Sequence, residues 1–347
     1  MKNFLRWERY VQKNNDCRTD CAVRGGSYHH VSSSRRKKDV KIGVSIGVGN
    51  AIRWENEKRY MEARAKELGA NIEVRLNKTN TPKTQQEDCR ERIDKGIDVL
   101  ILTPRSVANV DNILEYAKSK NVPVICYARV VLGKKIDLFV GYDSARIGQK
   151  MGQYISEAVY KGDYILLRGD SGDNNAALLY EGAMRYISQI RSDINIILDC
   201  AVPGWSPSEA KRIVKEAISA NGNRIDAILS PNDKIAEACA EALEELGIKN
   251  HVAITGMDAE LEAVRRIVKG RQDVTFYMDL KELSATAVNE AFHMARGEKV
   301  NVNADFDNHS GGTVPSNLIT GQLVTKENLN KILIDSGYFT KEEVYGK

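Results

Sequence analysis

Short apolar runs alternate with amphipathic stretches from residue 40 almost to the end of the chain. The first run, residues 40–46, is rich in β-branched residues and nearly continuous, which is typical of a strand covered by helices on both faces. A helical pattern then runs from about Ile52 to Leu68 and stops before Gly69, a residue type that commonly ends helices. This alternation predicts an α/β fold with parallel sheets.

The alternation falls into two series, which predicts two doubly wound parallel-sheet lobes. A helix at 146–160 separates the series, and another at 280–296 follows the second. After it the pattern turns irregular through 303–313. The expected strands are 40–46, 71–76, 99–102, 122–126 and 136–141 in the first series, 164–167, 195–198, 227–229, 252–254 and 275–277 in the second, and a terminal pair of segments, 317–324 and 327–334, that returns to one of the two sheets.

Composition and charge exclude several classes of protein. The 347 residues are 42% hydrophobic, but no apolar run is long enough to span a membrane and no secretory signal is visible at the N-terminus. The net charge of +4 is concentrated in residues 1–38, where ten Lys/Arg and three Asp/Glu give +7 and leave −3 for the rest. We therefore expect a basic, disordered tail at 1–38 and no nucleic-acid partner.

Three short motifs resemble functional signatures without the surroundings that their chemistry needs. Cys17 and Cys21, with two histidines downstream, match no common zinc spacing. Ser171 lies in a Gly-Asp-Ser-Gly segment like that of serine proteases, but no histidine and aspartate are placed to activate it. Gly47 and Gly49 lack the third glycine of a dinucleotide fingerprint. The sequence thus predicts no metal, no cofactor and no enzyme activity.

Polar and aromatic residues recur where the predicted strands end. Planar rings can cover the apolar face of a sugar, while amides, carboxylates and guanidinium groups can bind its hydroxyls. Singly, these residues have ordinary explanations such as helix caps or loop anchors, but their recurrence at one edge predicts a sugar site. The set comprises Arg53, Trp54, Arg129, Asn174, Asn175, Trp205, Asn232 and Asp258.

From about Val40 onward the chain resembles the type I periplasmic sugar-binding proteins, and among them the D-xylose-binding family. The resemblance implies a type I periplasmic binding protein fold, in which a three-crossover hinge joins two lobes that clamp a sugar. The crossovers would fall near residues 143, 279 and 316, giving an N-terminal lobe of 39–143 plus 280–315 and a C-terminal lobe of 144–279 plus 316–347. The segments that carry it are 53–54, 122–129, 173–176, 204–205, 230–233, 256–259 and 314–316.

The resemblance also implies roles for single residues. Trp54 and Trp205 would sandwich the sugar ring, and Arg129, Asn175, Asn232 and Asp258 would hold its hydroxyls. Two positions depart from the family pattern: Ala128 stands where an aspartate is usual, and Met278 stands where a lysine is usual. An acid and a base are absent together, so the net charge of the site is unchanged. The expected ligand is a pentose, with D-xylose as the first candidate, and the two changes could alter the sugar preference.

A binding protein of this kind would work outside the cytoplasm and present its closed form to a membrane partner. That partner would be the permease of an ATP-driven sugar importer or a sensor histidine kinase, and the sequence does not separate the two. A sugar-responsive transcription regulator would need an N-terminal helix-turn-helix of about sixty residues, and the tail is shorter and lacks its apolar pattern. An α/β enzyme would need a nucleophile, base or cofactor loop.

Overall fold

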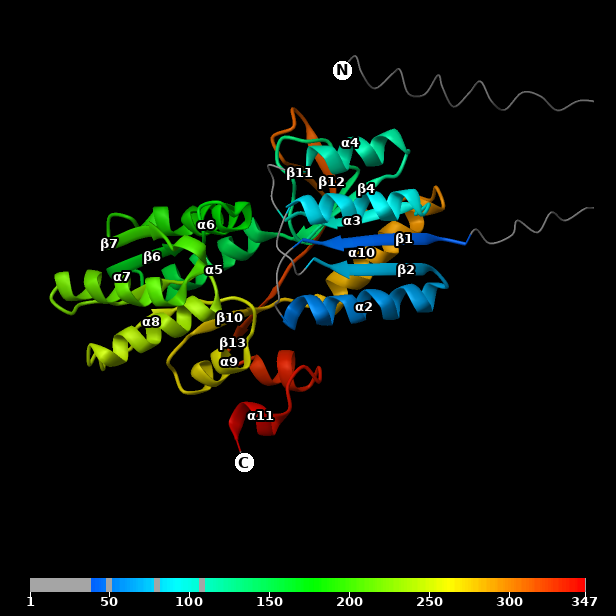
Figure 1. Cartoon of the computed structure of the whole chain (residues 1–347). Helices are drawn as coiled ribbons and strands as arrows, with labels where there is room; N and C mark the ends of the chain where they lie inside the picture. Colours follow the sequence, from blue (N-terminus) through cyan, green and yellow to red (C-terminus); the bar gives the residue numbers. More distant parts are fainter. Residues whose placement is uncertain (1–38, 48–51, 78–81, 106–109, 347) are drawn as a thin grey trace, which may run out of the picture. The chain divides into compact units, whose positions relative to one another are not determined.

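The first strand, β1 (Lys41–Ile46), lies within a seven-stranded sheet with the order β11-β12-β5-β4-β3-β1-β2 (Figure 1). Only the pair of β11 and β12 is antiparallel. Every residue of β1 except Lys41 is buried, because helices cover both faces of the strand. The other strands are β2 (Asn71–Leu76), β3 (Val99–Thr103), β4 (Val124–Tyr127), β5 (Leu138–Tyr142), β11 (Ala304–Asp307) and β12 (Thr313–Ile319).

This computed structural model describes residues 39–47, 52–77, 82–105 and 110–346, so the predicted tail and its Cys17 and Cys21 lie outside the described residues. Two helices, α2 (Ile52–Leu68) and α10 (Leu280–Ala295), contribute to one hydrophobic cluster of the first sheet. On the other face, α3 (Pro82–Asp94) and α4 (Asp111–Ser119) contribute to a second cluster. The first sheet is therefore the middle layer of three.

The second sheet has four parallel strands in the order β7-β6-β8-β9. One hydrophobic cluster joins it to α5 (Ser144–Ala158) and α6 (Asn174–Ile187). The other cluster joins it to α7 (Pro207–Ala220) and α8 (Asp233–Glu245). The α/β class with parallel sheets, predicted from the sequence, is confirmed. The strands are β6 (Gly162–Arg168), β7 (Ile194–Ala201), β8 (Ala227–Leu229) and β9 (Ala253–Ile254).

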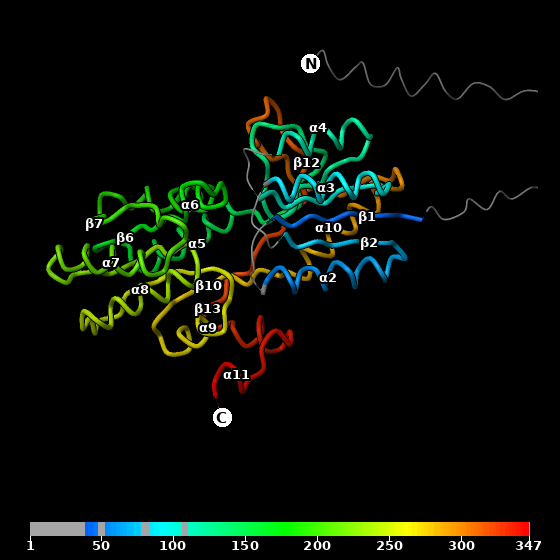
Figure 2. Tube along the Cα trace, in the orientation of Figure 1, coloured from blue at the N-terminus to red at the C-terminus, as the bar shows by residue number. Residues whose placement is uncertain are grey.

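The chain passes between the two sheet systems after β5, after β10 (Val274–Tyr277) and after β12 (Figure 2). The third passage leads into β13 (Gln322–Thr325), which pairs with β10 in a separate antiparallel sheet. The boundary expected at residue 316 falls inside β12, which stays paired with β5 through Ile319. The expected irregular stretch at 303–313 contains β11, because its residues pair with β12. The segment 317–324, expected to return to one of the two sheets, is split between β12 of the first sheet and β13 of the separate pair.

The C-terminal segment forms a small cluster of its own. Residues of α9 (Leu261–Val268) pack there against Leu329 and Leu333. The expectation that 327–334 returns to one of the two sheets is wrong, because Asn330–Ile334 forms a short π-helix and packs in this cluster through Leu333. The chain then forms α11 (Lys341–Tyr345).

Two glycines let α5 and α6 approach closely. A Cβ at Gly148 would overlap the carbonyl oxygen of Leu179, and one at Gly182 would overlap that of Ala145. This contact fixes the start of α6 beside the start of α5, where the Ser144 hydroxyl donates to Asn175 Oδ1 at 3.4 Å. The close packing of two helices therefore positions a predicted binding residue.

We expect Gly148→Ala to destabilise the protein. Alanine favours an isolated helix by about 0.5–1 kcal/mol, but overpacking a tight contact costs about 1–3 kcal/mol. The net loss should be about 1–2 kcal/mol in the free energy of unfolding, measured by chemical denaturation. Gly312→Ala is the control, because a Cβ there meets no atom within 4 Å. Equal stability of the two variants would contradict this account of the helix contact.

Candidate functional site

The predicted binding residues all follow the carboxyl ends of parallel strands, where ligands collect in folds of this type. Three of them lie near the first sheet and five near the second. Their places are the first turn of α2 after β1 for Arg53 and Trp54, the loop after β4 for Arg129, the first turn of α6 after β6 for Asn174 and Asn175, the loop after β7 for Trp205, the N-cap of α8 after β8 for Asn232, and the loop after β9 for Asp258.

Four of these residues line one cavity of about 500 Å³. They are Arg129, Asn174, Asn175 and Trp205, and all four side chains are half-buried. Sequence reasoning missed two further charged residues of this lining, Arg105 and Asp170. Each lies two residues after the end of a strand, β3 for Arg105 and β6 for Asp170, so the same strand-end rule would have found them.

A strained turn aims Arg129 into the cavity. The backbone N–H of Arg129 donates to the Tyr127 carbonyl at 2.7 Å, and Ala128 between them has a φ of 60°. Residues 127–129 therefore form a γ-turn of the rare kind, with a positive φ at its central residue. Strained backbone conformations of this kind concentrate at functional sites. The carbonyl oxygen of Ala128 accepts a long hydrogen bond of 3.4 Å from Asn175 Nδ2. Residues from both sheets thus meet at this turn.

The Gly-Asp-Ser-Gly segment supports Trp205. A Cβ at Gly169 would overlap the Trp205 ring, so glycine makes room for the indole. Asp170 accepts hydrogen bonds from the backbone N–H groups of Gly204, at 2.6 Å, and Gly172, at 2.8 Å, and these donors lower the pKa of its carboxyl. Ser171 is exposed. The segment therefore holds the Trp205 loop in place, which explains it without a catalytic serine.

A second group of the predicted binding residues centres on Arg53. Its Nε donates to Glu57 Oε1 at 2.8 Å, and the Glu57 side chain is fully buried while that of Arg53 is 36% exposed. The guanidinium carbon lies 4.7 Å from the centroid of the Trp54 ring, a cation–π contact. Trp54 is only 7% exposed and belongs to the core of the first sheet. Its contact with a sugar stays a prediction, whereas its support of Arg53 is observed.

Asp258 lies within electrostatic reach of Arg53, although the two follow strands of different sheets. Burial raises the pKa of the Asp258 carboxyl to about 6, and the Arg53 cation limits the rise. The buried Asp233 fixes the Asp258 loop by accepting from the Glu260 N–H at 2.9 Å. Asn232 caps α8, its Oδ1 accepting from a backbone N–H at 2.9 Å. Asn232 is not among the residues that line the 500 Å³ cavity.

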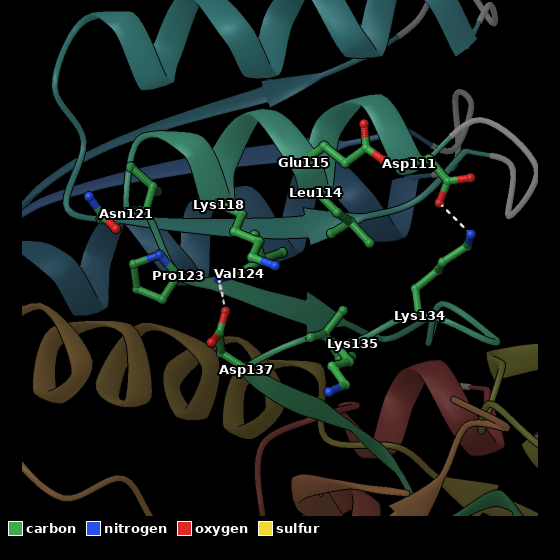
Figure 3. Close-up of a pocket in the computed structure, with 12 residues that line it drawn as sticks. Asp111, Leu114, Glu115, Lys118, Asn121, Pro123, Val124, Lys134, Lys135 and Asp137 are labelled. Atoms are coloured by element: carbon green, nitrogen blue, oxygen red, sulfur yellow. Dashed lines mark hydrogen bonds and ion pairs between the residues drawn. The ribbon is translucent and has the colours of Figure 1, made fainter. Parts of the chain in front are cut away.

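A larger cavity of about 660 Å³ lies at the opposite edge of the first sheet (Figure 3). Its lining includes Val124 at the start of β4, whose N–H donates to Asp137 Oδ2 at 2.8 Å, and an ion pair of 2.8 Å between Lys134 and Asp111. Amino ends of parallel strands are not where ligands collect. Within the described part of the chain, no group of three or more His, Cys, Asp or Glu side chains could hold a metal.

Residues 42–299 match the family described as periplasmic binding protein domain. Two similar proteins are named D-xylose-binding periplasmic protein: that of Haemophilus influenzae is 32% identical over 90% of this chain and 95% of its own length, and that of Escherichia coli is 31% identical over 88% and 93%. A solved structure of an ABC transporter solute-binding protein from Clostridium phytofermentans with bound β-D-glucose superposes with a TM-score of 0.77. It is 25% identical and covers 88% of this chain and 99% of that one.

We expect Gly169→Ala to displace the Trp205 ring, because the added methyl group occupies the ring's place. The variant should lose about 1–3 kcal/mol of stability, and its tryptophan emission should move to longer wavelength as the indole gains contact with water. Ser171→Ala, in the same loop and exposed, should change neither quantity. Thermal melting and emission spectra measure both, and a silent Gly169→Ala would refute the supporting role of this segment.

Proposed function

The chain belongs to the periplasmic binding protein family, and we propose that it is an extracytoplasmic solute-binding protein that binds one monosaccharide, a pentose such as D-xylose. The relatives named above are binding proteins and not enzymes, and this chain is of their kind. Binding without chemistry accords with a site built from rings, amides and fixed charges.

One observation carries the proposal. The indole of Trp205, the guanidinium of Arg129 and the amides of Asn174 and Asn175 line a single cavity at the carboxyl ends of strands. A sugar presents an apolar C–H face to a ring and several hydroxyls to fixed donors and acceptors. Residues that follow strands of both sheets line the cavity, as expected if the ligand is clamped between the two sheet systems.

The preference for a pentose rests on the two D-xylose-binding relatives. At two positions the site is less polar than the family pattern. Ala128 carries no side-chain oxygen, and Met278 is 7% exposed within the core of the second sheet. Hydrogen bonds to charged groups contribute about 1.5–3 kcal/mol each, so the ranking of pentoses against hexoses is the first quantity to measure.

The proposed location is extracytoplasmic, as the names of the two relatives suggest. In the described residues, no helix combines the length and apolarity of a membrane span. We propose the permease of an ATP-driven importer as the partner, with a sensor histidine kinase as the alternative. Loss of labelled-sugar uptake in cells lacking the gene would support the importer, whereas loss of sugar-induced transcription alone would support the kinase.

Calorimetry against a panel of pentoses and hexoses tests the function. We expect one site per chain and tighter binding of a pentose, with D-xylose among the best. Binding of hexoses alone would keep the solute-binding function and overturn the pentose. No heat with any monosaccharide, from protein whose melting transition is intact, would overturn the proposed function.

Arg129→Ala should weaken sugar binding by at least about 2 kcal/mol, which is roughly thirtyfold. Its planar fork can donate two hydrogen bonds at once in a site that excludes water. Arg185→Ala, on the exposed side of α6 far from the start of that helix, is the matched control and should bind as the parent does. A loss below threefold for Arg129→Ala would show that Arg129 is not a principal contact.

Sugar affinity should fall as the pH is lowered through about 6, because protonated Asp258 loses acceptor capacity for sugar hydroxyls. The free protein should respond in the opposite direction. A carboxyl whose folded pKa is raised contributes stability that is fully present below its unfolded pKa of about 4 and is lost as the pH rises through the folded value. Weaker binding at pH 5 would therefore not arise from unfolding.

Calorimetry from pH 5 to 8 checks this, with Asp258→Asn as the reference. The Asp258→Asn variant should bind the sugar weakly at every pH, and its affinity should no longer fall as the pH is lowered through about 6. If the affinity of Asp258→Asn still falls at low pH, a group other than Asp258 is responsible for the pH dependence of binding.

A further inference from the structure

Tyr142 occupies the last position of β5, one residue before the predicted first crossover. Its ring packs against two hydrophobic clusters, one of the first sheet and one of the second. It therefore lies where the two sheet systems meet, at the carboxyl edge that also carries Arg53 and Asp258. None of the sequence motifs pointed to it.

The hydroxyl group of Tyr142 is closed off from solvent and has no hydrogen-bond partner among the described residues. Another buried tyrosine shows the usual arrangement: the hydroxyl of Tyr164 donates to the carbonyl oxygen of Ile155 at 3.0 Å. A buried donor left unpaired costs about 1–3 kcal/mol. A phenylalanine would fill the same space without that cost, so the oxygen of Tyr142 points to a hydrogen-bond partner other than the described residues.

Charged groups act on this hydroxyl electrostatically, and no described residue forms a hydrogen bond with it. Burial raises the pKa of Tyr142, the Arg53 cation opposes the rise, and the carboxylates of Glu57, Asp279 and Asp258 add to it. The hydroxyl therefore keeps its proton at neutral pH and can donate. Arg53 Nε is occupied by Glu57, and Asp279 Oδ1 accepts from a backbone N–H at 2.9 Å as the N-cap of α10.

We propose that Tyr142 is a specificity-determining residue of the sugar site, whose hydroxyl donates a hydrogen bond to one oxygen of the bound monosaccharide. This inference rests on the proposed function and extends it to a residue outside the predicted set. In this proposal the partly exposed Arg53, whose charge acts on Tyr142, shifts toward the bound sugar and gives the sugar access to the hydroxyl. Met278 packs in the same cluster and has no hydrogen-bond donor, whereas a lysine is usual at this position in the family. In this proposal the Tyr142 hydroxyl supplies a donor to the sugar in this region.

Removal of the single oxygen provides the first test. Tyr142→Phe should leave the free protein at least as stable as the parent, because no hydrogen bond to a described residue is lost, and should weaken binding of the tightest monosaccharide of the panel by about fivefold or more. Tyr164→Phe is the matched control, with the opposite pattern: a lower melting temperature and unchanged sugar affinity. A Tyr142→Phe variant that loses stability and keeps full affinity would overturn the inference.

A second test identifies the bonded atom. The parent and Tyr142→Phe are titrated with that monosaccharide and with analogues that each lack one hydroxyl. The penalty of Tyr142→Phe should vanish for one analogue and persist for the others, which is the signature of a direct contact in a double-mutant cycle. An equal penalty for every analogue would show that the hydroxyl bonds to a protein group instead. A parent protein that binds no sugar overturns the proposed function itself, a result visible without any variant.

Discussion

The parallel order of the strands is the constraint on which the site depends. Parallel pairing places the carboxyl ends of all strands at the same end of the sheet. Residues that follow different strands therefore lie close together although they are far apart in the sequence. In the first sheet β1 lies between β2 and β3, and in the second β6 lies between β7 and β8. These are the points where the strand order reverses, and Arg53, Arg105 and Asp170 follow strands that meet there.

The charge of Arg53 is balanced by a neighbour on the same helix. The fully buried Glu57 one turn further along α2 accepts its Nε–H, and Trp54 offers a ring face to the guanidinium. The Arg53 side chain itself remains 36% exposed. A buried carboxylate beside a partly exposed cation holds the cation in place, because an unpaired buried charge would cost several kcal/mol.

The loops that carry the site are held in conformations that most residues avoid. Ala128, Trp205, Asp258 and Ala259 all have positive φ, with values of 60°, 55°, 104° and 49°. Such residues persist only where neighbouring contacts fix them. The fixing contacts are specific: Asp170 holds the Trp205 loop through the Gly204 N–H, and Asp233 holds the Asp258 loop through the Glu260 N–H. Each of these two loops is thus held by a specific hydrogen bond to a carboxylate of another segment.

By itself the sequence determined the α/β class, the order of most strands and helices, and the strand ends at which polar residues gather. Periodicity and helix stop signals suffice for this because they are local. Only the tertiary structure decided that Trp54 supports Arg53 from the core, that the Gly169 segment makes room for Trp205, that residues 304–307 form a strand, and that the Tyr142 hydroxyl is left unpaired. These facts depend on which side chains meet across long sequence separations, and burial and pairing at such contacts have no signature within a single stretch of sequence.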